Sequence, residues 1–581
     1  MVQPSRLMAW LAVLCLSFSL PSLSAQEPEA EPNTSFIETT NVRVVNVDVY
    51  VTSKDGTPIT DLQPGDFRLE EDGRPVELTN FYKVVDGIPV SEFIETPATS
   101  EPESGEPEAE EPEVQESEPA AVAADPRLID EPEVPESQRL WLIVYLDNHN
   151  MNPIHRTRIL TQLNEFIATN VIDGNYGMLV TYDQSLNVRQ PFTDSRSTLL
   201  RAVEDLEKAS GRPTSFERER TDLLRQIEEA DTQGVLAGQI RQYAQSIVVD
   251  LRFTVESLTD MVRSLAGLPG RKALLYVSDG MPMSPAKDLY YALRNKFSNA
   301  PAFAGMTEYD MTRQLRQLEQ QANSNRVSFY TIDAKGLQMP TGFSAENRGG
   351  SFANDLRSSV DALHQGNYQD SIRRIALRTG GVPILNTNNV APRLRTVSKS
   401  LRSYYSLGYA PLNQEDGRYH RIELKVDRPG VVVRYREGYR SKDTATVIGE
   451  ALQAGMRYGL ESNPLEIQVS AAAPEPFRDD YLLLPVTIRI PIGNLELAPQ
   501  GGLHRAQFEL YFSALSDKGK AADLVSDSVS LEIPPEDLEV ARTQIYRYDT
   551  KLQIKPGPQR LGIAVRDLLG AKVSKVVYPL R

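Results

Sequence analysis

Residues 140–147 read Leu140-Trp141-Leu142-Ile143-Val144-Tyr145-Leu146-Asp147, seven apolar or aromatic residues that end at an aspartate. An unbroken apolar run of this length is typical of a strand that is buried on both faces of a parallel sheet. Asn152-Pro153 then supplies a helix N-cap and a proline at the first helical position, and apolar residues follow at helical spacing. A second buried strand leads into Ser278-Asp279-Gly280. Because such strands alternate with helical patterns, residues 138–403 are predicted to form a doubly wound, Rossmann-like α/β domain.

Two β segments flank this domain in the sequence. Residues 41–91 combine an alternating valine run with turns such as Glu71-Asp72-Gly73. Residues 404–441 contain two alternating runs around Pro429-Gly430, which predicts a β hairpin. Each segment alone has too few strands to be stable, and a domain inserted in a loop needs closely placed ends. We therefore expect the hairpin to pack with the N-terminal segment.

The rest of the folded chain is assigned from pattern alone. Residues 442–462 favour a helical connector, and residues 463–581 carry short alternating runs that predict a C-terminal β-sandwich. Residues 209–240 form a charged, helix-favouring insertion within the α/β domain. Residues 337–365 are rich in Gly, Ser and Asn, which indicates a loop.

Length, charge and composition limit the number of domains and the classes of partner that the chain can bind. The chain has 581 residues, enough for about two to four domains. Its net charge of −17 argues against nucleic acid and against electrostatic docking on anionic lipid. Residues 92–137 are rich in Glu and Pro and predict a disordered acidic linker, with an acidic partner-binding tail as the alternative. No segment after the first 25 residues has the apolar length of a transmembrane helix.

Residues 1–25 have the pattern of a secretory signal peptide. Arg6 gives a positive start, an apolar run follows, and small residues end at Ala25. An uncleaved membrane anchor is the alternative reading. Cys15, the one cysteine of the sequence, lies inside this segment, so the mature chain has no disulfide and no thiolate metal site. We expect an exported protein that is periplasmic, on the cell surface or secreted.

Several motifs occur in a fixed order around the α/β domain. The N-terminal segment contains Asp61-Leu62-Gln63-Pro64-Gly65-Asp66-Phe67, followed by Glu71-Asp72-Gly73. The domain contains Gly267-Leu268-Pro269-Gly270-Arg271-Lys272-Ala273-Leu274. The closing segment contains Tyr404-Tyr405-Ser406-Leu407-Gly408-Tyr409, Tyr419-His420 and Arg436-Glu437-Gly438-Tyr439. Together these motifs resemble the bacterial VWFA-related family, exported proteins with a von Willebrand factor A-type domain between two β segments. The resemblance covers roughly residues 41–440.

The resemblance implies a metal-ion-dependent adhesion site at the carboxyl edge of the sheet. Such a site takes an Asp-x-Ser-x-Ser loop, a Thr and a second Asp, which are hard oxygen ligands suited to Mg²⁺. Asp147, Thr193 and Asp279 fit three of these positions, but His149 and Met151 replace the two serines. Because imidazole and thioether are poor Mg²⁺ ligands, the site is predicted to be degenerate. Alternatively, the two aspartates cap strand-exit turns.

Function is expected to lie at this same edge. Doubly wound sheets bind ligands beyond the carboxyl ends of their strands, so Asn148, His149 and Asn150 are predicted to form part of a protein-binding edge. The sequence shows no G-x-S-x-G elbow, phosphate loop or dinucleotide fingerprint, and its five histidines are scattered. We expect a non-enzymatic adhesion or scaffold protein with a protein partner and no cofactor besides the Mg²⁺ just discussed. The alternative is an envelope hydrolase with a cleft near residues 337–365.

Overall fold

The central sheet of the α/β domain has six strands in the order β11-β10-β9-β6-β7-β8. The computed structural model describes residues 44–91, 138–172, 174–207, 216–298, 308–338, 351–478 and 481–580. The strands are β6 (Leu140–Leu146), β7 (Tyr176–Tyr182), β8 (Leu186–Thr193), β9 (Arg271–Ser278), β10 (Val327–Asp333) and β11 (Pro383–Ile384). All pairs are parallel except β7 with β8. Every residue of β6 and β9 is buried, as the apolar runs predict.

Helices cover both faces of this sheet. Alternate side chains of β6 point into two separate cores, because successive residues of a strand face opposite sides. Leu142 and Val144 pack with α1 (Pro153–Asn170), α2 (Arg196–Glu207) and α9 (Ala391–Arg402). On the other face, Trp141 and Ile143 pack in a core with α3 (Phe216–Glu229), α4 (Leu236–Ser264), α5 (Lys287–Phe297), α7 (Thr312–Ser324) and α8 (Ser351–Arg378). The predicted doubly wound fold is confirmed.

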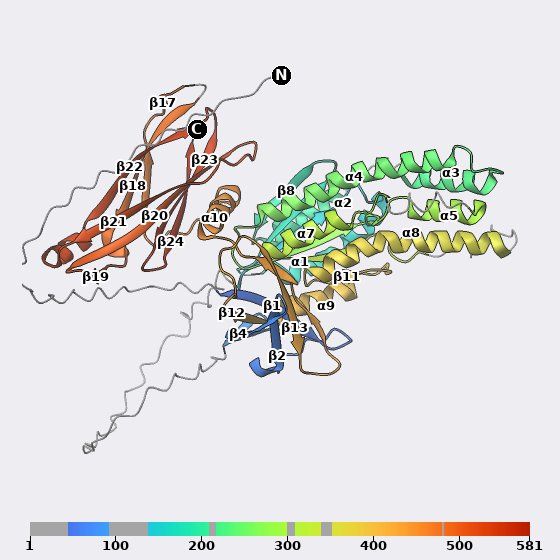
Figure 1. The fold of residues 1–581 in the computed structure, drawn as a ribbon, viewed down its shortest axis with the longest axis horizontal. Coiled ribbons are helices and arrows are strands. Elements are labelled where there is room, and N and C mark those ends of the chain that lie inside the picture. The colour runs from blue at the N-terminus through green and yellow to red at the C-terminus, as the bar shows by residue number, and fades with distance from the viewer. Residues whose placement is uncertain are drawn as a thin grey trace, which may run out of the picture. The chain divides into compact units, whose positions relative to one another are not determined.

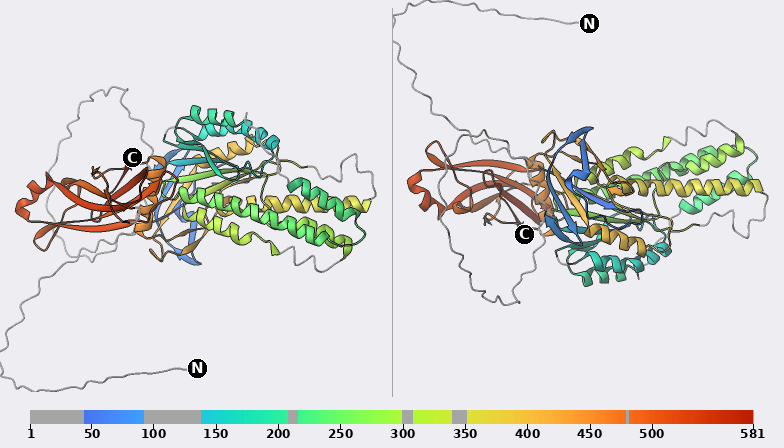
Figure 2. Two further views of the ribbon diagram at one scale, coloured as in Figure 1. Left: turned by 90° about the horizontal axis from the view of Figure 1, so that it is seen from above. Right: turned by 90° about the horizontal axis from the view of Figure 1, so that it is seen from below.

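The helices of the second face extend past the carboxyl edge of the sheet. Helix α4 has 29 residues and α8 has 28, and α3 and α5 contact them. Figures 1 and 2 show these helices, in green to yellow, side by side beyond the strands. The predicted loop over residues 337–365 is therefore wrong for residues 351–365, which are helical. Val360 is fully buried there, so packing overrides the loop-favouring composition.

The two β segments that flank the domain form two shared sheets, in the orders β14-β1-β12-β4-β5 and β15-β13-β2-β3. The N-terminal strands are β1 (Val45–Thr52), β2 (Phe67–Glu71), β3 (Arg74–Val76), β4 (Leu78–Val85) and β5 (Ile88–Ser91), with a short turn of 3-10 helix η1 (Pro64–Asp66). The later strands are β12 (Tyr404–Tyr409), β13 (Tyr419–Val426), β14 (Val432–Arg434) and β15 (Gly438–Arg440). In Figure 1 the blue strands lie directly beside β12 and β13.

Strand β12 lies between two strands that precede the α/β domain. Val45 of β1 pairs with Tyr409, and Val84 of β4 pairs with Tyr404. Phe67 and Tyr405 pack in the shared core with ring centroids 5.2 Å apart. Residues from both sides of the inserted domain thus build one β module.

The predicted hairpin within residues 404–441 is wrong. Strand β13 pairs with β2 and β15, whereas β14 pairs with β1 in the other sheet. Gly430 has a φ of +79° in the turn between β13 and β14, so Pro429-Gly430 does reverse the chain. An alternating run reports that one face of a strand is buried but does not select the partner strand. The N-terminal segment supplies the partners instead.

The C-terminal part is a β-sandwich, as predicted. One sheet contains β16 (Gln468–Ala471), β17 (Glu475–Pro476), β18 (Leu482–Pro491) and β22 (Ile545–Ile554). The other contains β19 (Ala498–Gln500), β20 (Leu503–Ser516), β21 (Val525–Ile533), β23 (Gln559–Asp567) and β24 (Val573–Leu580). Ile488, Phe508 and Ile563 from the two sheets share one core. Short helical turns are η4 (Ile492–Asn494), η5 (Pro535–Asp537) and α11 (Leu538–Arg542).

Helix α10 (Thr444–Tyr458) precedes the sandwich. Asp443 caps it by accepting the backbone N–H of Thr446, and Gly459 ends it in the left-handed conformation. Within the described ranges, no helix combines the length and apolar character needed to cross a membrane. The predicted signal peptide at residues 1–25 and the predicted linker at residues 92–137 lie outside the described residues.

Candidate functional site at the carboxyl edge of the sheet

Asp147, the first predicted ligand, follows β6 and is fully buried. Its Oδ1 accepts the backbone N–H of Asn150 at 3.1 Å, and its Oδ2 accepts the hydroxyls of Tyr276 at 2.5 Å and Ser278 at 3.1 Å. The side-chain amide of Asn150 donates to both carboxylate oxygens. Burial raises the pKa of Asp147, and these hydrogen bonds oppose the rise only in part. The carboxylate therefore caps the strand-exit turn.

Asp279 follows β9 at the same edge. Its Oδ2 accepts the backbone N–H of Asn152 at 2.9 Å, and Nδ1 of His155 lies 2.9 Å from each carboxylate oxygen. The backbone N–H of Asp279 donates to the carbonyl of Asn150. These bonds join the exits of two parallel strands to the first turn of α1, so the structure brings the two predicted aspartates to one edge.

Thr193, the third predicted ligand, lies at the opposite edge of the sheet. It ends β8, and β8 is antiparallel to β7, so Thr193 pairs with Gly177 near the start of β7. Its hydroxyl accepts the backbone N–H of Ser195 at 3.1 Å. The sequence around Thr193 does not reveal the direction in which its strand runs. The prediction of a joint site made by Asp147, Thr193 and Asp279 is therefore wrong.

The loop predicted to form a binding edge is held against α4. Nε2 of His149 bonds to the carboxylate of Asp250, and this bond raises the pKa of His149. The amide of Asn150 donates to the hydroxyl of Thr254 at 3.0 Å. Asn148 keeps a buried amide oxygen without a hydrogen-bond partner. Of these three residues, Asn150 lines the cavity described next.

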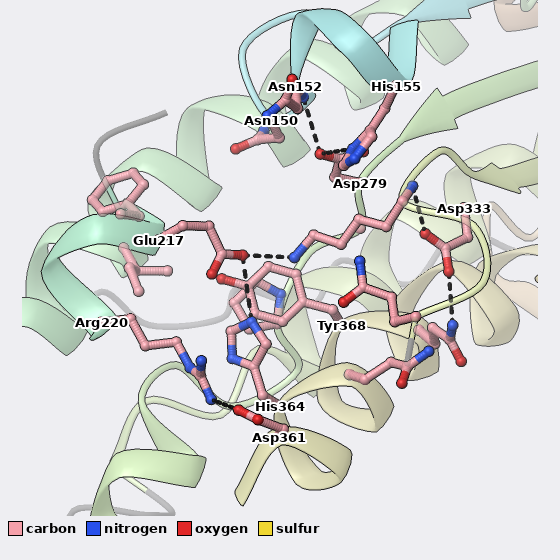
Figure 3. Close-up of a pocket in the computed structure, with 18 of the residues that line it drawn as sticks. Asn150, Asn152, His155, Glu217, Arg220, Asp279, Asp333, Asp361, His364 and Tyr368 are labelled. Carbon is pink, nitrogen blue, oxygen red and sulfur yellow. Dashed lines mark hydrogen bonds and ion pairs between the residues drawn. The ribbon is translucent and has the colours of Figure 1, made fainter. Parts of the chain in front are cut away.

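A cavity of about 500 Å³ opens at this edge. Its floor is formed by the exits of β6, β9 and β10, and its walls are formed by α3, α4 and α8 (Figure 3). The polar and charged side chains that line it include Asn150, Asn152, His155, Glu217, Arg218, Arg220, Asp250, Asp279, Asp333, Lys335, Asp361, His364 and Tyr368. The position agrees with the rule that doubly wound sheets bind ligands beyond the carboxyl ends of their strands.

One cluster joins the exit of β10 to α3 and α8. The ammonium of Lys335 lies 2.6 Å from Oε1 of Glu217 and 4.6 Å from the ring centroid of Tyr368. Nε2 of His364 is buried 3.5 Å from the same Glu217 oxygen (Figure 3). Burial opposes ionisation, but His364 and Lys335 hold the pKa of Glu217 well below its usual range. Glu217 is thus ionised and fixed at the centre of the wall.

A second cluster lies behind it on α3, α5 and α8. The guanidinium of Arg220 lies 2.6 Å from Asp288 and 3.0 Å from Asp361. Nδ1 of His364 lies 3.2 Å from Asp288. Burial alone raises the pKa of Asp288, but His364 and Arg220 hold that pKa at about 2. The two clusters share His364 and tie the three helices together.

The cavity lining has an excess of negative charge. The described residues that line it include five carboxylates and three Lys or Arg side chains. Asp333 is buried, and burial raises its pKa although Gln369 donates to it at 2.7 Å. Of the described lining residues, none is Ser, Thr or Cys. This arrangement can hold a cationic group, and its His–carboxylate pairs can also move protons.

Sequence reasoning missed Glu217, Lys335 and His364. Lys335 follows the exit of β10 by two residues, so the strand-exit argument that predicted a binding edge at Asn148 to Asn150 also applies to it. Glu217 and His364 lie on helices that are far apart in the sequence, and no local pattern points to their meeting.

No family model matches the sequence, and no curated protein matches it. Among solved structures, the chain is similar to BatB from Bacteroides thetaiotaomicron at 10% identity, with 45% of this chain and 97% of that chain covered and a TM-score of 0.21. A von Willebrand factor type A protein from Catenulispora acidiphila aligns at 11% identity over 76% of this chain and 66% of its own, with a TM-score of 0.22. The von Willebrand factor domain of the type V pili tip protein Mfa5 from Porphyromonas gingivalis aligns at 10% identity over 46% and 96%, with a TM-score of 0.23.

The directions of the strands in the central sheet define the fold class of the domain. Five parallel strands, one antiparallel edge strand and helices on both faces define a doubly wound α/β domain. Its insertion between two paired β segments agrees with the resemblance to the VWFA-related family.

Proposed function

We propose that this chain is an exported protein-binding protein, an adhesin or a scaffold, that holds its partner at the carboxyl edge of the α/β domain. The observation that carries this proposal is the cavity of about 500 Å³ between the strand exits and α3, α4 and α8. Ligand sites of doubly wound folds lie at this position. The many ion pairs on the walls fix their shape in advance, which lowers the ordering cost of binding.

The charges of the cavity indicate the chemistry of the partner. Five lining carboxylates against three Lys or Arg side chains favour a cation, and the whole chain has a net charge of −17. We propose that a Lys or Arg side chain of the partner enters the cavity and lies near Asp279 and Asp333. Such a contact attracts the partner over a distance and weakens with salt.

The proposed location follows from the sequence. The signal-peptide pattern of residues 1–25 supports export, and the acidic, proline-rich residues 92–137 fit a spacer within a secreted or periplasmic protein. A partner is therefore sought in the cell envelope or outside the cell.

A capture experiment tests the proposal. The full chain is immobilised and exposed to an envelope extract of the bacterium that makes it, at about 50 mM and about 500 mM salt. We expect a specific protein that is retained at low salt and released at high salt. The bait Ala362→Trp places a bulky ring on an exposed lining position of α8 and removes no charged side chain, and it should lose this protein. Equal capture by both baits would contradict the proposal.

A second candidate function, an envelope hydrolase, has one observation in its favour. The cavity lies against Gln338 and the part of α8 around His364, and it holds His155 bonded to Asp279, a pair suited to general acid–base chemistry. A screen for hydrolysis of peptide, ester and glycosidic substrates separates the two functions. Turnover that His155→Gln abolishes would favour the hydrolase, whereas a binding protein shows no turnover.

A further inference from the structure

A cluster outside the α/β domain gathers three metal-ligating side chains. Glu71, Asp72 and His420 place their ligand atoms within 4.8 Å of one another, where β2 pairs with β13. Nδ1 of His420 lies 2.8 Å from Oδ2 of Asp72 and 3.9 Å from Oε1 of Glu71. Three sequence motifs, Glu71-Asp72-Gly73, Tyr419-His420 and the motif that ends at Tyr439, meet at this point.

Glu71 presents an unpartnered oxygen to this cluster. Its side chain is fully buried, and Oε2 accepts the hydroxyl of Tyr439 at 3.1 Å. Oε1, the oxygen that faces His420, accepts no hydrogen bond of ordinary geometry. The buried hydroxyl of Tyr409 lies near Glu71, and burial together with the charge of Glu71 raises the pKa of that tyrosine. A buried carboxylate oxygen without a donor is costly, because desolvation of the charge is not offset. A cation bound between Glu71 and His420 would offset it.

The outer contacts orient the three ligands. Nε2 of His420 lies 3.1 Å from Oδ1 of Asp416, so the ring has a carboxylate on the side away from Glu71. Metal-bound histidines commonly donate their second N–H to such a carboxylate. The backbone N–H of Arg421 donates to Oδ1 of Asp72 at 2.8 Å and leaves Oδ2 directed at the ring.

The charge of the cluster also favours a cation. Glu71, Asp72 and Asp416 carry three carboxylates around one imidazole. Among the described residues, none of these carboxylates forms an ion pair with Lys or Arg. A divalent ion would neutralise most of the excess negative charge. Asp72 is nearly half exposed, which leaves the ion a route from solvent.

We propose that Glu71, Asp72 and His420 form a divalent metal site suited to Zn²⁺, with Asp416 as a positioning residue. One nitrogen and two carboxylate oxygens match the three protein ligands of many zinc sites, with water in the fourth position. Ligand atoms around tetrahedral Zn²⁺ are roughly 3.3–3.6 Å apart, between the two distances observed here. His420 keeps its Nε2 proton toward Asp416, and the ion takes the place of a proton at Nδ1.

The metal would cross-link two distant segments of the chain within the β module. Asp72 and His420 are 348 residues apart in the sequence, and the α/β domain lies between them. An ion held by both strands ties the N-terminal segment to the segment that follows the domain, and it stabilises the folded module because the unfolded chain lacks the site. This site is separate from the partner cavity, so its failure would leave the proposed function standing.

Calorimetric titration of the full chain tests this site. The chain is freed of metal by chelation and then titrated with Zn²⁺. We expect one Zn²⁺ per chain and a higher unfolding temperature. Glu71→Gln and His420→Gln should abolish this binding, and Asp416→Asn should weaken it about 10- to 100-fold without changing the stoichiometry. His504→Gln, a histidine variant on β20 of the C-terminal sandwich, is the matched control and should bind Zn²⁺ as wild type does. Absent binding, or binding that survives His420→Gln, would overturn the site.

X-ray absorption at the zinc edge of the wild-type complex gives a measurement that does not depend on the folding of any variant. We expect a first shell of nitrogen and oxygen atoms with the scattering of a single imidazole. A shell without imidazole, or with two, would contradict the assignment.

Discussion

Nδ1 of His155 lies 2.9 Å from both carboxylate oxygens of Asp279, and this contact joins the exit of β9 to the first turn of α1. Asp147 makes the corresponding bonds at the exit of β6. Both residues fit metal-ligand positions in the sequence. In the structure, the carboxylate oxygens of each accept hydrogen bonds that hold the edge of the sheet together. The carboxyl edge is therefore a rigid frame for the cavity above it.

Alanine substitutions of Asp147 and Asp279 should lower the free energy of unfolding by different amounts. Asp147→Ala leaves the buried hydroxyls of Tyr276 and Ser278 without an acceptor, so we expect a loss of about 3 kcal/mol or more in the free energy of unfolding. Asp279 is slightly more exposed, and Asp279→Ala should cost about 1–2 kcal/mol. Urea unfolding measures both. A larger loss for Asp279→Ala than for Asp147→Ala would contradict this account of the edge.

Magnesium should not bind at this edge. The oxygens of Asp147 accept hydrogen bonds from Asn150, Tyr276 and Ser278, and Thr193 lies across the sheet. We expect calorimetry with Mg²⁺ and with Mn²⁺ to give no heat that Asp147→Ala or Asp279→Ala removes. Stoichiometric Mg²⁺ binding that both variants abolish would show that the loops rearrange into a metal site.

Acid should weaken the helical wall of the cavity through Asp288. Its pKa of about 2 in the folded chain lies below the usual value of 3.8, so its stabilising contribution is present above pH 3.8 and is lost as the pH falls through about 2. The difference corresponds to about 2 kcal/mol at roughly 1.4 kcal/mol per pH unit. Unfolding free energies from pH 5 to pH 2 should fall less steeply for Asp288→Asn than for wild type.

The control for this pH series is Asp194→Asn, which changes an exposed aspartate on the same domain. Its slope should follow the wild-type slope. If Asp288→Asn gave the same slope as well, the buried pairs with Arg220 and His364 would not contribute to acid stability.

Two glycines of the α8 region should respond in opposite directions to alanine. A Cβ on Gly381 would lie 1.9 Å from the carbonyl oxygen of Phe329 on β10, so Gly381→Ala should destabilise the domain by about 1–3 kcal/mol. Gly366 lies within α8, and its added Cβ would meet no atom within 4 Å. Gly366→Ala should stabilise by about 0.5–1 kcal/mol. Thermal unfolding of the two variants measures both signs, and a neutral Gly381→Ala would refute the close contact.

Buried parallel strands are the part of this fold that the sequence predicts best. An apolar run such as Leu140–Leu146 predicts a buried strand because both faces of the strand are covered. The polar residue that follows the run marks the carboxyl edge of the sheet. The sequence does not predict in the same way which strands of distant segments pair with each other. The alternation at Ile422 and Val433 reports burial, yet only the structure shows that these residues belong to two different sheets.

The sequence could place a site residue at the correct edge of the sheet only where the direction of its strand was known. Asp147 and Asp279 follow parallel strands and lie at the same edge of the sheet, whereas Thr193 ends an antiparallel strand and lies at the far edge. Glu217 lies on α3 within the insertion over residues 209–240, whereas His364 lies on α8 after β10, and their contact depends on how these two helices pack. A helix turn seen alone does not indicate which distant side chain it will meet.

Surface plasmon resonance of the captured partner on two tryptophan variants of α8 tests whether the cavity holds the partner. Ala362→Trp fills part of the cavity, and Leu377→Trp places the same ring at a half-exposed position of α8 outside the cavity lining. We predict that Ala362→Trp weakens binding at least about 10-fold, equal to about 1.4 kcal/mol, and that Leu377→Trp binds as wild type does. Unchanged binding by a folded Ala362→Trp variant would contradict the claim that the partner is held at this cavity.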